Sequence, residues 1–182
     1  MKQGEEVERL LLIDAPCQLK LSEGLPAGLH GWFDEMGLLG LDGNKKKGTP
    51  DWLIPHFDAS IRALSSYTIA PLSSRSATST TTKPPNPKVH ILHATAGVCL
   101  SPDSPRPPPS ILNDDMSKNE NVKWLLNNRT DTASMGWEKL VGEGRIRGVK
   151  SVEGANHFTL MREGWISEVG RWLGRALGGV EG

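Results

Sequence analysis

Short apolar runs alternate with longer amphipathic stretches along this chain of 182 residues. A short continuous apolar run lies in residues 9–13, a second candidate strand covers residues 89–94, and a third, weaker one covers residues 146–152. Short apolar runs bounded by loop residues are typical of strands in a parallel sheet. We therefore expect three strands and interpret the first, residues 9–13, as buried on both faces.

Apolar residues at helical spacing occupy much of the chain between these runs. One stripe recurs every three or four positions, at Ile54, Phe57, Ile61 and Leu64. It predicts a helix that begins near Pro55, because proline fits the first helical turn. Further helices are expected within residues 25–39, 122–127 and 165–176, the last ending at Gly178-Gly179. Strands alternating with helices predict an α/β fold with a partly parallel sheet.

Composition removes several function classes. The 21 basic and 21 acidic residues give zero net charge, which argues against a nucleic-acid or anionic-membrane binder. No apolar run is long enough to span a membrane, and no secretory leader is visible. Two cysteines, Cys17 and Cys99, cannot build a disulfide framework, so we expect a cytoplasmic protein. Residues 42–48 and 73–87 are too polar to order themselves and are interpreted as surface insertions.

Two titratable residues follow the first and the last predicted strand. Asp14 comes directly after residues 9–13, and His157 lies shortly after residues 146–152. Loops at the carboxyl ends of parallel strands converge, so the two side chains are expected to meet. An acid followed by a late histidine matches the α/β-hydrolase order of serine, acid and histidine. The 143 residues between them leave room for inserted helices.

The nucleophile of such a site is missing from the sequence. A nucleophile elbow needs Gly-x-Ser-x-Gly, and no pair of glycines four residues apart encloses a serine here. Cys17 is a possible thiol substitute, although nothing in its surroundings predicts a lowered pKa. Asp103 is a rival acid, because many α/β-hydrolases carry the acid one strand later.

Other polar residues have simpler interpretations. His90 and His93 lie three apart on a predicted strand and face opposite sides, and His56 is isolated, so we expect no metal site. Arg129 and Asp131, in Asn-Asn-Arg-Thr-Asp, are interpreted as a turn network.

Several sequence blocks resemble the thioesterase domain that ends fungal non-reducing polyketide synthases. The most specific are Leu-Leu-Ile-Asp-Ala-Pro-Cys at residues 11–17 and Gly-Ala-Asn-His-Phe-Thr-Leu-Met at residues 154–161. The other blocks lie at residues 25–26, 36–40, 52–61, 97–99, 105–107, 124–131 and 136–137. Together they are similar to the C-terminal two-thirds of such a domain.

This resemblance implies a partial α/β-hydrolase fold with an incomplete thioesterase-like domain over residues 1–182, in which residues 18–72 form lid-type helices. Asp14 would match the triad acid and His157 the triad base, while the family serine lies upstream of the acid. The family releases a polyketide from the phosphopantetheine arm of an acyl carrier protein, by hydrolysis or Claisen-type cyclisation. Its implied partners are therefore a carrier protein or synthase and a polyketide thioester, with no metal and no cofactor of its own.

Two questions stay open at this point. Trp52, Phe57 and Ile61 either line an acyl chamber or are ordinary packing residues of one helix. The chain itself is part of a working thioesterase, a module that binds the synthase or carrier without chemistry, or a remnant without function.

Overall fold

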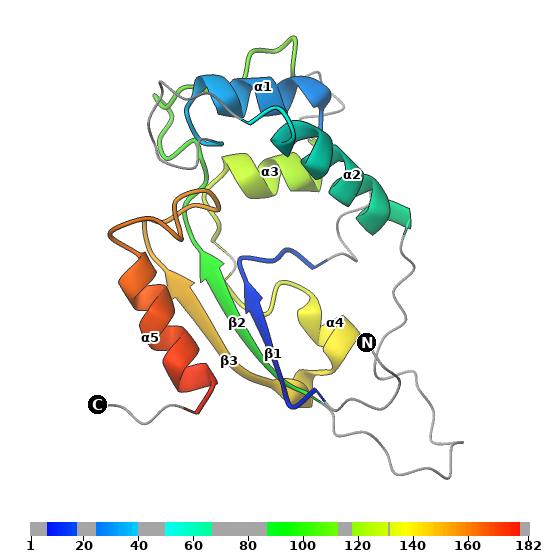
Figure 1. The fold of residues 1–182 in the computed structure, drawn as a ribbon. Coiled ribbons are helices and arrows are strands. Elements are labelled where there is room, and N and C mark those ends of the chain that lie inside the picture. The colour runs from blue at the N-terminus through cyan, green and yellow to red at the C-terminus, as the bar shows by residue number, and fades with distance from the viewer. Residues whose placement is uncertain are drawn as a thin grey trace.

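The computed structural model describes residues 7–17, 25–39, 50–66, 87–112, 118–130 and 132–178. Three parallel strands form one sheet in the order β1 (Arg9–Ile13), β2 (Lys88–Ala94) and β3 (Ile146–Val152), as Figure 1 shows. The predicted strands agree with these bounds to within one residue, and the fold is α/β. The predicted insertions at 42–48 and 73–87 lie outside the described residues, Pro87 apart.

The first strand is less buried than its sequence suggests. All five residues of β1 are half-buried, whereas the last four residues of β2 are fully buried. Leu11 and Ile13 pack against the core on one face and Leu10 and Leu12 against the core on the other, so both faces of β1 are covered, but only partly. Among the described residues β1 pairs only with β2, so it forms an edge of the sheet, and β2 takes the central position.

Both faces of the sheet are covered by helices (Figure 1). On one face α5 (Ile166–Ala176) packs through a cluster that includes Leu92, Val152, Val169 and Trp172. On the other face the short α4 (Trp137–Val141), which sequence periodicity did not predict, packs against Val89, Ile91 and Cys17. A 3-10 turn, η4 (Glu143–Arg145), leads from α4 into β3. The alternation of side chains along each strand divides the core between the two faces.

Three helices lie beyond the carboxyl ends of the strands, at the top of Figure 1: α1 (Ala27–Glu35), α2 (Leu53–Ser66) and α3 (Glu120–Leu126). We call them the helical cap. A separate apolar cluster, with Leu29, Phe33, Val122, Leu125 and Leu126 among its buried members, holds the cap together. The cap is thus a second core, built beside the one around the sheet.

The helix ends follow local rules. Pro55 lies in the first turn of α2, as its sequence predicts. The side chain of Asn119 caps α3 by accepting hydrogen bonds from the N–H groups of Asn121 and Val122, at 2.9 and 3.2 Å. Gly178 follows α5 with a φ of +82°, the left-handed conformation that ends many helices. None of the described helices is long and apolar enough to cross a membrane.

Candidate active site

Asp14 is fixed at the carboxyl end of β1 by the end of β2. Its N–H donates to the carbonyl of Leu92 at 2.7 Å, and its Oδ1 accepts from the N–H of Ala94 at 2.9 Å. The residue has a φ of +45°, which an aspartate tolerates better than most residues, and is 2% exposed. A carboxylate this deeply buried requires partners of its own.

His157 is the first of these partners. Its Nδ1 lies 3.0 Å from Oδ2 of Asp14, across 143 residues of sequence. The turn that presents it is held by Asn156, whose Oδ1 accepts from the N–H groups of Phe158 and Thr159 at 2.9 and 3.0 Å. An ionised carboxylate only accepts hydrogen bonds, so Nδ1 carries the proton of a neutral His157. Nε2 is then free to accept a proton.

The rest of the imidazole is packed but accessible. The ring of Trp124 meets His157 edge-on, with 5.0 Å between centroids, and Phe158 does so at 5.4 Å. The histidine side chain nevertheless remains 41% exposed, in contrast to the buried Asp14. The pair therefore joins a buried acid to a base that a ligand can reach.

Arg129 is the second partner of Asp14. Its Nη1 donates to Oδ1 of Asp14 and, at 2.7 Å, to the carbonyl of Ala94. Its Nε donates to the carbonyl of Trp124 at 3.2 Å, and the guanidinium lies over that ring, 3.9 Å from its centroid. The side chain is only 5% exposed. The interpretation of Arg129 as part of a turn network is thus corrected to a buried ion pair with Asp14; Asp131 lies outside the described residues.

Opposing influences set the charge of Asp14. Burial is the largest, and it raises the pKa of the carboxyl group. The hydrogen bond from His157 and the positive charge and hydrogen bond of Arg129 act the other way and together prevail, so the pKa of Asp14 is lowered. Asp14 is therefore ionised at neutral pH.

A close backbone contact joins α3 to the loop after β2. The side chain of Asn128 accepts from the N–H of Gly97 and donates to the carbonyl of Leu100, both at 3.0 Å. A Cβ on Gly97 would lie 2.3 Å from the carbonyl oxygen of Leu126, so only glycine fits there. This contact sets the position of Arg129, which directly follows Asn128.

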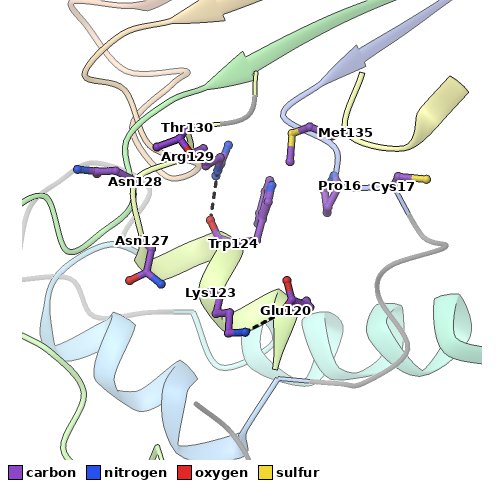
Figure 2. A pocket seen from close by; sticks show the side chains of 10 residues that line it. All are labelled: Pro16, Cys17, Glu120, Lys123, Trp124, Asn127, Asn128, Arg129, Thr130 and Met135. Atoms are coloured by element: carbon purple, nitrogen blue, oxygen red, sulfur yellow. Dashed lines mark hydrogen bonds and ion pairs between the residues drawn. The ribbon is translucent and has the colours of Figure 1, made fainter. Parts of the chain in front are cut away.

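A pocket of about 310 Å³ opens beside these residues. Figure 2 shows Trp124 and Arg129 in its lining, with Pro16 and Cys17 from the loop after β1 and with Met135. Trp124 and Arg129 therefore belong both to the pocket and to the Asp14–His157 site.

The remaining candidate residues are dispersed. Trp52 is 60% exposed beside α2, Phe57 is 36% exposed on that helix, and neither lines the pocket. Ile61 lies in α2, but its side chain is outside the described set. Asp103 is exposed in the loop after β2. Within the described ranges, no group of three histidine, cysteine, aspartate or glutamate side chains is arranged to hold a metal ion.

The sequence of this chain is similar to part of several known proteins. No family model matches the chain. It is 42% identical over 177 residues to a non-reducing polyketide synthase of Preussia isomera, which covers 97% of this chain and 7% of that protein. It is 39% identical over 177 residues to the conidial pigment polyketide synthase of Aspergillus fumigatus, covering 97% of this chain and 8% of that protein. The chain is similar to a segment of non-reducing polyketide synthases.

The similarity to these synthases runs through the whole site. The match to the Preussia isomera synthase extends over 177 of the 182 residues, so Asp14, Arg129 and His157 lie within the matched span. A synthase of Zymoseptoria tritici is 40% identical over 170 residues, which cover 93% of this chain and 7% of that protein. The chain thus spans less than a tenth of the length of the synthases it matches.

The sequence predicted that Asp14 and His157 would meet, as they do, but it did not predict the contacts of Arg129 and Trp124 with this pair. A loop arginine after a short helix is usually solvated, and nothing in its spacing shows that it is buried. One sequence feature could have indicated the burial of Arg129. Trp124, on the predicted helix, lies five residues before it, a spacing that lets the guanidinium fold back over the ring.

Proposed function

We propose that this chain carries the acid and the base of a thioesterase-type, α/β-hydrolase-like active site of polyketide biosynthesis. The observation that carries the proposal is the hydrogen bond between Asp14 and His157, 3.0 Å long, with the histidine side chain exposed. The substrate would be a polyketide thioester presented on the phosphopantetheine arm of an acyl carrier protein. The similarity to polyketide synthases supports this substrate class.

The proposed reaction follows from the charge of the pair. A serine hydroxyl attacks the thioester carbonyl while Nε2 of His157 takes the hydroxyl proton, and Asp14 stabilises the resulting imidazolium. When the carbon–sulfur bond breaks, His157 returns the proton to the departing thiolate. The acyl-serine ester is then cleaved by water or by a deprotonated carbon of the same acyl chain, the latter giving Claisen cyclisation.

The serine has to come from outside this sequence, because no Gly-x-Ser-x-Gly occurs within it. The position of the base suits such an arrangement. Nε2 of His157 has no hydrogen-bond partner among the described residues, and the adjoining edge strand β1 pairs with β2 alone within the described part of the chain. In this proposal α1 and α2 act as a lid, and Trp52, Phe57 and Ile61 supply apolar contacts to the acyl chain.

The test is a thioesterase assay with an acyl thioester of N-acetylcysteamine. One arm uses the chain alone, and the second uses the chain extended by the flanking segments of the Preussia isomera synthase. We expect cleavage only by the extended protein, with kcat/KM reduced about 10³-fold or more by His157→Gln and by Asp14→Asn. Trp52→Ala should raise KM more than it changes kcat.

Other outcomes have distinct meanings. Cleavage by the extended protein that survives His157→Gln would contradict the proposal. Cleavage by the chain alone, abolished by both His157→Gln and Cys17→Ser, would replace the serine with the Cys17 thiol. Binding of an acyl carrier protein without cleavage in either arm would favour a docking module instead.

A further inference from the structure

We propose that Arg129 is a positioning residue that keeps His157 neutral. Its guanidinium supplies the positive charge beside the buried Asp14, which a doubly protonated His157 would otherwise have to supply. The inference rests on the proposed function, in which a neutral His157 is the base. It concerns the state of the site before any substrate binds.

The two oxygens of Asp14 are divided between two partners. Oδ1 accepts from Nη1 of Arg129 and, at 2.9 Å, from the N–H of Ala94, while Oδ2 faces Nδ1 of His157 at 3.0 Å. Arg129 is also anchored by the carbonyl of Ala94 at 2.7 Å. The arginine therefore compensates the carboxylate without occupying the oxygen that orients the imidazole.

The separate partners of the two Asp14 oxygens matter for the charge of His157. A buried carboxylate without a cation is costly, and the nearest group able to acquire a positive charge is the imidazole of His157. A doubly protonated imidazole has no lone pair on Nε2 and cannot take a proton from a nucleophile. With Arg129 in place, Asp14 is already compensated, so His157 needs only the single proton on Nδ1.

Two basic side chains from the neighbouring segments have partners of their own. On α3, Lys123 is paired with Glu120 at 2.7 Å. In the turn before α5, Arg162 donates to the carbonyl of Leu38 at 3.2 Å. In the described part of the chain, Asp14 forms ion pairs with Arg129 and His157. Arg129 is thus the permanent cation that faces this carboxylate.

Trp124 aligns both partners with one ring. The guanidinium of Arg129 stacks over it at 3.9 Å, and the imidazole of His157 meets it at 5.0 Å. Arg129 and His157 therefore approach Asp14 from directions fixed by the same side chain. A lysine at position 129 would keep the charge but lose the fork of donors.

Nitrogen-15 NMR of histidine-labelled full-length chain at about pH 7.5 tests the proposal, because it reports protonation and tautomer directly. The His157 signals are assigned by their loss in His157→Gln. We expect one proton, on Nδ1, in the unaltered chain, a second proton in most molecules of Arg129→Gln, and one proton again in Arg129→Lys. Lys150→Gln, at an exposed ion pair on β3, should match the unaltered chain.

A folded Arg129→Gln chain whose His157 still carries one proton on Nδ1 would overturn the proposal. If this variant does not fold, the rotation of the Arg129 guanidinium group is measured by NMR in the unaltered chain, with its signals assigned by their loss in Arg129→Lys. Slow guanidinium rotation is expected, and rotation as fast as in a free arginine would overturn the proposal. Neither measurement depends on thioester cleavage, so failure of the proposed function would be seen separately.

Discussion

The molecule has two regions that are stabilised differently: the sheet packed against α5, and the helical cap. In the first, an apolar stripe of Val169, Trp172 and Ala176 covers an apolar face of the sheet. The cap also has an apolar core, but its junction with the sheet includes a buried ion pair, Asp14 with Arg129. Burial of apolar area is non-directional, whereas hydrogen bonds require particular atoms in particular places.

The difference shows where function can be built. A helix on an apolar face tolerates small shifts, because many contacts of similar energy replace one another. The junction of the cap should tolerate smaller shifts, since Gly97, Asn128 and Arg129 each meet defined backbone atoms. The candidate site lies at the rigid junction, and a site of this kind needs such a fixed geometry.

Arg129→Gln, which breaks the junction, and its matched change in the other region are expected to have the largest effects on stability. The Arg129→Gln variant loses a buried ion pair and the hydrogen bonds of Arg129 to Asp14 and Ala94, and charging His157 instead also has a cost, so the free energy of unfolding should fall by about 3–5 kcal/mol. Urea unfolding followed by tryptophan fluorescence measures the change.

The matched change in the sheet with α5 is Trp172→Ala, which removes a side chain that is 6% exposed. Its cost should be similar, about 3–5 kcal/mol, from lost packing. The His157 signals in NMR should change in Arg129→Gln and stay unchanged in Trp172→Ala. Equal disturbance of His157 by both variants would contradict the distinction between the two regions.

Glycine-to-alanine substitutions should have opposite signs in the two regions. Gly97→Ala places a methyl group 2.3 Å from a carbonyl oxygen of α3 and should destabilise the chain by about 3 kcal/mol. Gly174→Ala in α5 has no heavy atom within 4 Å and should stabilise it by about 0.5–1 kcal/mol. Thermal unfolding of the two variants and the unaltered chain provides the measurement. If both variants were destabilised by a similar amount, the close contact at Gly97 would not explain the loss.

Acid should weaken the junction through Asp14. The pKa of Asp14 is lowered in the folded chain, so its ionised form contributes stability that is complete above its unfolded pKa, about 4. That contribution is lost as the pH falls through the lower folded pKa. Unfolding in urea from pH 6 to pH 2 should therefore show a loss below about pH 4 that is absent from Asp14→Asn. An equal acid sensitivity in Asp14→Asn would assign the loss to other groups.

The smallest effect is expected from Lys150→Gln, between β3 and α5. Its ammonium group lies 2.9 Å from the carboxylate of Glu168, but the two side chains are 42% and 33% exposed. Water screens such a pair, so the free energy of unfolding should change by less than about 0.5 kcal/mol. A loss comparable to that of Arg129→Gln, seen in the same urea experiment, would remove the contrast between exposed and buried pairs.

Periodicity was sufficient for most elements of the fold. The strands at Arg9–Ile13 and Ile146–Val152 were predicted with their observed bounds, because a short apolar run leaves few alternatives. The five-residue α4 was missed, since it is too short to show a repeat. The partial burial of β1 was not predictable, because the apolar run does not report which strands are its neighbours in the sheet.

The candidate site was predictable in part. The positions of Asp14 and His157 after two parallel strands placed them at one edge of the sheet, and the structure brings them within hydrogen-bond distance. The role of Arg129 was not visible, because burial of a loop side chain depends on packing between distant segments. The contributions of Trp52, Phe57 and Ile61 to an acyl chamber stay a prediction.

The separation of 143 residues between Asp14 and His157 has a consequence for synthesis of the chain. A ribosome adds about 5–20 residues per second, so the histidine follows the aspartate by about 7–30 s. During that interval Asp14 has no imidazole partner, and Arg129 itself is made 115 residues after it. The Asp14–Arg129 ion pair can therefore form before the third strand is synthesised, whereas the Asp14–His157 hydrogen bond has to wait until after it.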